Sequence, residues 1–221
     1  MKKIFARYFI FAVGLYLLSL GIVLIIRSAL GTTPISSLNY VLSLNTSLSL
    51  GTCTFMLNMI LIAGQFWLTR GMYSRKKVIE ILLQLPFSFV FGAFIDCNMY
   101  LCNGITPNSY FASIMLLLVG CVVQATAVVL EIKPNVVMMS AEAFVKYASD
   151  RYGKEFGKIK RKFDIVLVVL AVLTSLVMSK HIQGVREGTV ISALITGTIV
   201  TFISQKLLTR RNYERIRNIK G

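Results

Sequence analysis

The sequence predicts an all-α polytopic membrane protein, built from six transmembrane helices in two inverted three-helix repeats. Hydrophobic residues make up 56% of its 221 residues and charged residues only 15%, with a mean hydropathy of +0.72. Several apolar runs reach the ~20 residues that a helix needs to cross the hydrocarbon core. Interrupted segments also follow the first and the fourth of these runs. Such a composition excludes an ordinary soluble domain, in which charge is near average and polar faces break up the apolar runs.

We expect one membrane domain over residues 1–221, with repeat one at about 5–101 and repeat two at about 110–208. A basic cytoplasmic tail follows at 209–221. The first run is expected to be a retained span, because a cleaved signal peptide has a shorter apolar region and a small-residue cleavage site. The six spans are expected at about Phe5–Ile26, Leu50–Leu68, Val78–Leu101, Tyr110–Leu130, Phe163–Ser179 and Thr189–Leu208.

The basic residues indicate the orientation of the chain. If the N-terminus is cytoplasmic, segments 1–8, 70–77, 131–162 and 206–221 lie on the cytoplasmic side and hold 21 of the 24 Lys and Arg residues. This distribution satisfies the positive-inside rule, so both termini are expected to be cytoplasmic. Basic clusters next to spans suit anionic lipid headgroups. The net charge of +15 is therefore interpreted as cytoplasmic flanks, and no motif supports nucleic-acid binding.

The stretch Arg27–Gly51 separates the first two spans and does not fit the spanning pattern. It holds an arginine, a Leu-Gly-Thr-Thr-Pro break at 30–34, and a short segment that is too brief to cross a bilayer. Non-helical backbone occurs at membrane depth only where protein or a water-filled cavity surrounds it. The stretch is therefore either an ordinary external loop or a broken, re-entrant element that lines a cavity.

A similar interruption appears in the second half, at Glu131–Gly157. With an odd number of spans in each half, the two interruptions face opposite sides of the membrane. Paired interrupted segments in inverted halves are a sequence pointer to a transporter binding site, since a half-helix starting near each proline would direct free N–H groups inward. The landmark pairs are Pro34 and Pro134 (100 positions apart), Gly51 and Gly157 (106), and Gly92 and Gly197 (105).

The leading functional hypothesis is a small-solute transporter or permease that works by alternating access. Polar groups in spans need protein, water or solute partners, because facing lipid is costly. The same residues can instead be interhelical contacts, and Asp96 is expected to form an ion pair with Arg27 that fixes the break or to bind a charged solute. The candidate binding residues are Thr32, Thr33, Pro34, Ser36, Asn39, Asn58, Asp96, Gln124, Pro134, Asn135 and Arg186.

No enzyme signature occurs: the chain lacks a phosphate loop, a nucleophile elbow and a His-Glu metal motif. It has one histidine and four cysteines without zinc-type spacing, so we expect no catalytic residues, metal or cofactor. Cys97 and Cys102 flank an expected external turn. A disulfide between them is possible in principle, but two unpaired thiols are the favoured interpretation.

Four short motifs resemble the YczE/YyaS/YitT group of bacterial membrane proteins, and the similarity extends over essentially all six expected spans. The resemblance implies a bacterial cytoplasmic (inner) membrane protein with six helices, and it names no substrate. Many relatives carry Pro-Trp-Asp where this chain has Pro34-Ile35-Ser36, so functions that depend on that aromatic and acid are not expected here. The motifs are Leu-Gly-Thr-Thr-Pro at 30–34, Gly51-Thr52, Phe163-Asp164 and Arg186-Glu187-Gly188-Thr189-Val190.

A competing hypothesis from another class is a non-transporting membrane accessory protein. Its basic inner loop, 131–162, would dock a partner protein or anionic lipid. The sequence leaves open the solute, the coupling ion and the oligomeric state, a homo-oligomer included.

Overall fold

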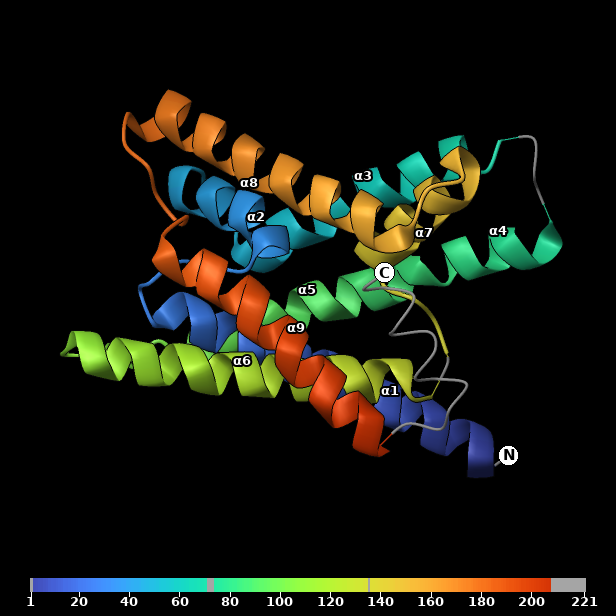
Figure 1. The fold of residues 1–221 in the computed structure, drawn as a ribbon, viewed down its shortest axis with the longest axis horizontal. Helices are drawn as coiled ribbons and strands as arrows, with labels where there is room; N and C mark the ends of the chain where they lie inside the picture. Colours follow the sequence, from blue (N-terminus) through green and yellow to red (C-terminus); the bar gives the residue numbers. More distant parts are fainter. Residues whose placement is uncertain (1, 71–73, 135, 208–221) are drawn as a thin grey trace.

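The computed structural model describes residues 2–70, 74–134 and 136–207, and in these residues all regular secondary structure is α-helical (Figure 1). The helices form an elongated bundle with most of their axes along its length. Asn135 and the basic tail at 209–221 lie outside the described residues. The helices are α1 (Lys2–Arg27), α2 (Pro34–Asn45), α3 (Leu50–Leu68), α4 (Arg75–Leu82), α5 (Gln84–Leu101), α6 (Tyr110–Ile132), α7 (Ser140–Tyr152), α8 (Phe156–Ser179) and α9 (Glu187–Leu207).

Five stretches are long and apolar enough to cross a membrane, and they lie where the first five spans were predicted. The apolar part of α9 within the described residues, Glu187–Val200, is shorter, so the sixth span stays a prediction. Large apolar side chains cover the outside of the bundle, among them Val177 (82% exposed) and Ile165 (62%). Such a surface requires a lipid environment. The chain is therefore a helical, multi-pass membrane protein.

The third predicted span is two helices rather than one. α4 ends at Leu82 and α5 begins at Gln84. Pro86 explains the break, because its nitrogen cannot donate to the carbonyl of Leu82 and its ring collides with that carbonyl. The apolar sequence continues through the break, so the hydropathy pattern alone does not reveal it.

The stretch Arg27–Gly51 contains the short helix α2, which begins at Pro34 as the sequence predicted. Proline suits this position because its missing N–H would be unsatisfied in a first helical turn. The Thr33 hydroxyl caps the helix and accepts a hydrogen bond from the Ser36 N–H at 3.4 Å. α2 packs against α8 and α3 (Figure 1). It is therefore an internal element of the bundle, not a loop outside it.

The corresponding helix of the second half, α7, begins at Ser140, so the prediction of a half-helix starting near Pro134 is wrong. Pro134 directly follows the last turn of α6, a position where proline ends a helix because it cannot continue it. Its carbonyl accepts a hydrogen bond from the Arg7 side chain at 2.8 Å. α7 packs against α3 and α8 at the end of the bundle opposite α2 (Figure 1).

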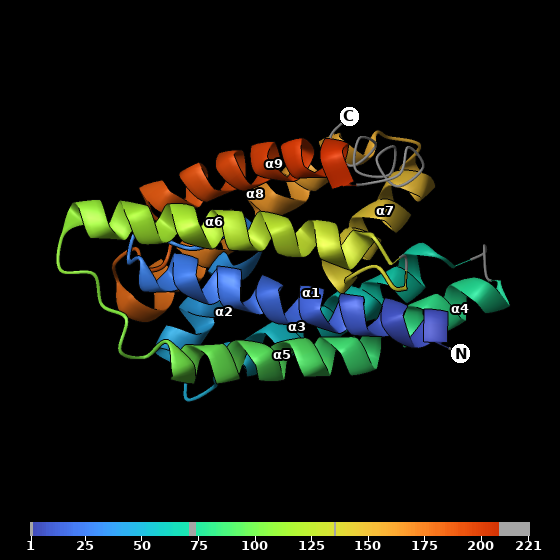
Figure 2. The ribbon, with the colours of Figure 1, turned by 90° about the horizontal axis from the view of Figure 1, so that it is seen from below.

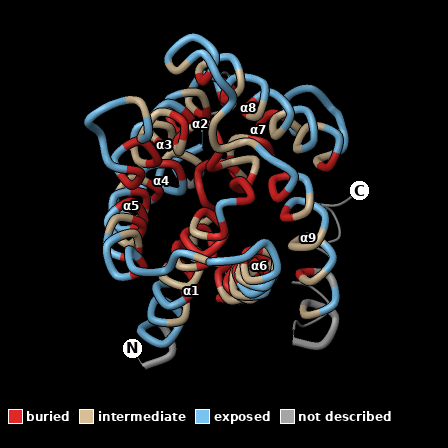
Figure 3. Tube along the Cα trace, turned by 90° about the vertical axis from the view of Figure 1, so that its left-hand side faces the viewer, coloured by how far each residue is buried: buried red, intermediate tan, exposed pale blue. Residues whose placement is uncertain are grey.

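The longest helix contact joins α1 and α6, which run side by side along the bundle (Figure 2). Glycines allow the two backbones to approach closely, as in other membrane helix pairs. A Cβ atom on Gly21 would lie 2.7 Å from the backbone nitrogen of Gln124, and one on Gly14 would lie 3.0 Å from that of Glu131. Figure 3 shows the buried residues gathered in the middle of the bundle.

Three further helix pairs pack against each other in the bundle. α1 also packs on α5, α6 packs on α9, and α3 packs on α5. At the α3–α5 contact, a Cβ atom on Gly92 would lie 2.8 Å from the carbonyl oxygen of Gly51. Within the described residues, no comparable contact joins α8 and α9.

Substituting Gly21 by alanine tests the α1–α6 contact. The added methyl group meets rigid backbone, so we expect a loss of about 1–3 kcal/mol in the free energy of unfolding, measured by SDS titration in mixed micelles. Gly104→Ala is the control, because a Cβ atom there has no neighbour within 4 Å. Equal stability of the two variants would contradict the close packing of α1 and α6.

Candidate functional site

The break between α1 and α2 is held by the start of α9. The Leu30 carbonyl accepts from the Gly188 N–H at 2.8 Å, and the Thr32 N–H donates to the Thr189 hydroxyl at 3.2 Å. Gly31 has φ +129°, a conformation that favours glycine. Free backbone groups at the break thus find partners within the protein.

Three candidate residues belong to this junction rather than to a separate binding site. The Thr32 hydroxyl donates to the Gly184 carbonyl at 3.2 Å, and Thr33 caps α2. The Arg186 side chain donates to the Ala29 carbonyl at 3.1 Å and lies 3.6 Å from the Glu187 carboxylate. Their contacts fasten α9 to the segment before α2.

Asp96 caps the start of α3. Its carboxylate accepts hydrogen bonds from the Gly51 N–H at 2.7 Å and from the Ser49 hydroxyl at 2.6 Å. Arg27 instead donates to the Met99 carbonyl at 2.8 Å and to the Asn103 side chain at 3.1 Å. The predicted Arg27–Asp96 ion pair is therefore wrong. Each charge serves the nearest helix end: the acid an N-terminus and the arginine a C-terminus, as the helix dipole favours.

Asn39 on α2 and Thr54 on α3 form a buried polar contact, and together with Asn58, which is also buried on α3, they are called the α2–α3 cluster. The Asn39 amide nitrogen donates to the Thr54 hydroxyl at 3.3 Å, and that hydroxyl donates to the Leu50 carbonyl at 2.8 Å. Asn58 lies one turn beyond Thr54 on α3, which places the two side chains on the same face. Asn39 is 1% exposed and Asn58 is 7% exposed.

This cluster contains two unsatisfied polar atoms. The Asn39 Oδ1 and the Asn58 Nδ2 are buried and have no hydrogen-bond partner. An unsatisfied buried polar group costs about 1–3 kcal/mol, so such atoms require an explanation. The sequence analysis chose Asn39 and Asn58 but missed Thr54, although its spacing of four residues from Asn58 was a usable signal.

The other candidates lie apart from this cluster. Ser36 accepts a hydrogen bond from the Thr33 hydroxyl at 3.0 Å, and the Pro34 carbonyl accepts from Ser37 at 2.7 Å, both within the first turn of α2. The Gln124 backbone lies in the α1–α6 contact, and its Oε1 is buried without a partner. Pro134 lies in the connection before α7.

The second half places charged groups at α7 and α8. Lys160 and Asp164 form an ion pair at 2.8 Å, and Glu142 lies in the first turn of α7. Burial raises the pKa of the Glu142 carboxyl above its ordinary range, and the nearby Lys160 ammonium offsets part of this rise. α8 begins at Phe156, so Asp164 lies within this helix and pairs with Lys160.

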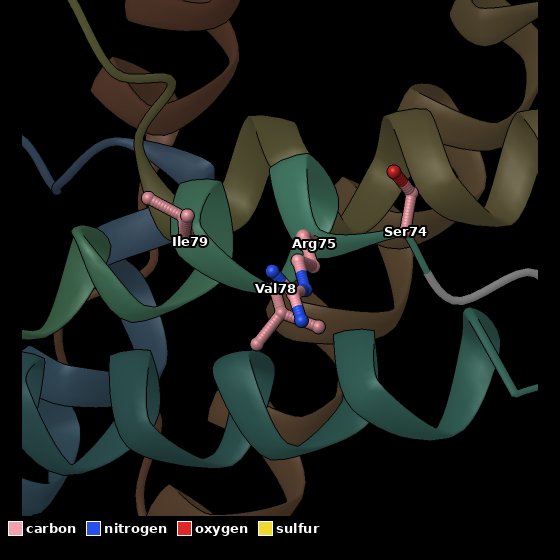
Figure 4. Close-up of a pocket in the computed structure, with 4 residues that line it drawn as sticks. All are labelled: Ser74, Arg75, Val78 and Ile79. Atoms are coloured by element: carbon pink, nitrogen blue, oxygen red, sulfur yellow. The ribbon is translucent and has the colours of Figure 1, made fainter.

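A surface pocket at α4 is separate from all of these residues (Figure 4). Ser74, Arg75, Val78 and Ile79 line it. None of them was a candidate, and the pocket lies outside the α2–α3 cluster.

Residues 5–205 match a family of unknown function, DUF6198. The chain belongs to this family. It is also 32% identical, over 130 residues, to the uncharacterized protein YyaS of Bacillus subtilis (strain 168). That match covers 58% of this chain and 61% of YyaS, so the chain spans under two thirds of that relative. The predicted resemblance to YyaS-type proteins is confirmed. No solved structure matches the chain.

The cysteines of this DUF6198 member are unpaired, and its potential metal ligands are not clustered in the described residues. All four thiols are free, with Cys97 exposed and Cys102 buried, which agrees with the favoured interpretation of unpaired thiols. In the described part of the chain, no group of three or more His, Cys, Asp or Glu residues could hold a metal ion.

A double-mutant cycle tests the assignment of Arg27 and Asp96 to separate helix ends. We expect Asp96→Ala to lower the free energy of unfolding by about 1–2 kcal/mol, as for a lost helix cap. With Arg27→Ala, the coupling energy should stay below about 0.5 kcal/mol, because the two side chains share no partner. A coupling above about 1 kcal/mol in SDS titrations would instead support the ion pair.

Proposed function

We propose that this protein is a small-solute transporter that works by alternating access in a bacterial cytoplasmic membrane. In this proposal six spans form two inverted three-helix repeats, and both termini are cytoplasmic. Catalysis is not part of its function. The positive-inside distribution of Lys and Arg supports the orientation, and the arrangement of the helices supports the repeats.

An offset shared by two pairs of helix starts supports the duplication. α7 begins 106 positions after α2, and α8 begins 106 positions after α3. In this register Ser140, not Pro134, is the counterpart of Pro34. The close contact between Gly14 and Glu131 likewise corresponds to that between Gly120 and Ile25, because each contact becomes the other under the same shift.

The packing partners support a two-fold relation between the halves. α2 packs on α8 while α7 packs on α3, and α1 packs on α5 while α6 packs on α9. The short helices α2 and α7 lie toward opposite ends of the bundle (Figure 1). In the proposed inverted-repeat topology, one interruption would lie toward each side of the membrane, and the separation of α2 and α7 supports this.

One pair of equivalent contacts differs between the halves, and this observation carries the proposal. α3 and α5 are closed together at Gly51 and Gly92, whereas α8 and α9 do not pack in the described residues. In an alternating-access transporter the two repeats exchange conformations. In the second state Gly157 would meet Gly197, and the α3–α5 contact would open.

The competing accessory hypothesis has less support. It requires loop 131–162 to be free for docking. Most of that segment forms α7 and the first turns of α8, and α7 packs on α3. Its buried residues include Ala143, Val145 and Tyr147.

Locking α8 against α9 tests the proposal. In a background with Cys97→Ser, Cys102→Ser and Cys121→Ser, a disulfide between Lys158→Cys and Thr198→Cys joins positions next to Gly157 and Gly197. Cys53 is 3% exposed beside the α3–α5 contact and serves as the reporter. We expect the lock to speed labelling of Cys53 by a membrane-impermeant maleimide about tenfold or more, because it selects the state in which α3 and α5 separate.

The matched control is a disulfide between Thr52→Cys and Ala93→Cys, the positions next to Gly51 and Gly92 in the first half. This lock holds α3 against α5, so Cys53 should stay protected. The proposal fails if the α8–α9 disulfide does not form in membranes, or if it forms and leaves Cys53 as slow to react as in the reduced protein.

A further inference from the structure

The polar cluster between α2 and α3 lacks two hydrogen-bond partners of opposite kind. The Asn39 Oδ1 is an acceptor without a donor, and the Asn58 Nδ2 is a donor without an acceptor. Both side chains are more than nine-tenths buried. Asn39 donates to the Thr54 hydroxyl, and Thr54 lies one helical turn before Asn58 on α3. A molecule that satisfied both atoms would have to offer one donor and one acceptor.

The cluster itself is uncharged, because its polar groups are two amides and a hydroxyl. The nearest acid along α3 and α5, Asp96, accepts hydrogen bonds from the Gly51 N–H and the Ser49 hydroxyl. Arg27 donates to the Met99 carbonyl and to Asn103, and its Nε is buried without a partner. A charged solute would therefore find no opposite charge within the cluster itself, and burial of an unpaired charge is strongly unfavourable.

The positions in the second half that correspond to Thr54 and Asn58 carry charged residues instead of neutral ones. Under the shift of 106 residues, Thr54 corresponds to Lys160 and Asn58 to Asp164. Lys160 and Asp164 satisfy each other across 2.8 Å. The first half keeps neutral groups with open hydrogen-bonding capacity at these positions.

The cluster also lies next to the contact that the proposed transport cycle opens. Thr54 and Asn58 follow Gly51 by one and two helical turns, on the same face of α3. Separation of α3 from α5 would expose this face first. We propose that Asn39, Thr54 and Asn58 bind a small uncharged solute that carries both a hydrogen-bond donor and an acceptor, such as a primary amide or a polyol. This inference rests on the proposed transport function for the route of entry.

The test measures solute entry into proteoliposomes by stopped-flow light scattering, with urea, acetamide and glycerol as uncharged probes and glutamate as the charged one. The full chain should speed re-swelling for at least one uncharged probe and not for glutamate. Asn58→Leu removes the open donor and keeps the number and branching of the side-chain heavy atoms, so it should return the rate to that of protein-free liposomes. Asn45→Ala is the control. Its amide, also on α2, pairs with Gln183 at 3.0 Å outside the cluster, so entry should be unaffected.

The melting temperature distinguishes a solute-binding role of Asn58 from a role in stabilising the fold. If Asn58 is reserved for a solute, Asn58→Leu should raise the melting temperature of the empty protein by about 2 °C or more, because it removes an unsatisfied polar group. A lower or unchanged melting temperature would mean that Asn58 is a structural hydrogen-bonding residue or is satisfied by a buried water, and would overturn the inference.

Three flux results would also overturn it: entry of glutamate alone, entry of none of the probes, or unchanged entry in Asn58→Leu and Asn39→Ala. The disulfide-lock experiment keeps this failure distinct from failure of the proposed function. If the α8–α9 lock exposes Cys53 while these probes do not enter, the transport cycle stands and the solute class is wrong.

Discussion

Each interruption of a helix in this protein has to satisfy its free backbone groups inside the bundle, because hydrocarbon offers no partners. The break before α2 meets this constraint through α9, where Gly188 donates to the Leu30 carbonyl at 2.8 Å. α7 is also held by α3, where the Gln65 side chain donates to the Ser140 carbonyl at 3.1 Å. Each short helix is thus fastened to a helix of the other half. This exchange of partners holds the N-terminal and C-terminal halves of the chain together.

The same constraint makes the open polar atoms of the α2–α3 cluster costly. Other polar groups of the bundle are paired, such as Gln65 with Gln84 at 2.8 Å and Lys160 with Asp164 at 2.8 Å. Buried side-chain atoms of Arg27, Asn98, Gln124 and Thr196 also lack a partner. Asn39 and Asn58 are left with open atoms next to the glycine contact between α3 and α5. A fold that pairs so many other groups keeps such atoms open at a cost, which is characteristic of functional sites.

Hydropathy and composition predicted much of the fold. The second span matches α3 in both bounds, and Pro34 marks the start of α2, because span length and proline chemistry act locally. The errors arose where tertiary contacts decide. Pro134 ends α6 instead of starting α7. The charges of Arg27 and Asp96 serve separate helix ends, although they were expected to meet. Among the candidate binding residues, the structure joins Thr33 to Ser36 and places Thr32 and Arg186 at the junction with α9. Asn39 instead contacts Thr54, which the sequence analysis did not select.

The central claim is that the stretch after Arg27 forms a buried half-helix inside the membrane domain. Cysteine accessibility scanning over residues 34–48 in intact membranes tests it most directly, in a background without native cysteines. The account predicts that cysteines at Ser36, Ser37, Asn39 and Val41 resist a membrane-impermeant reagent added outside, while one at the exposed Leu48 reacts quickly. Uniform, rapid labelling of all these positions would show an external loop and would contradict the account.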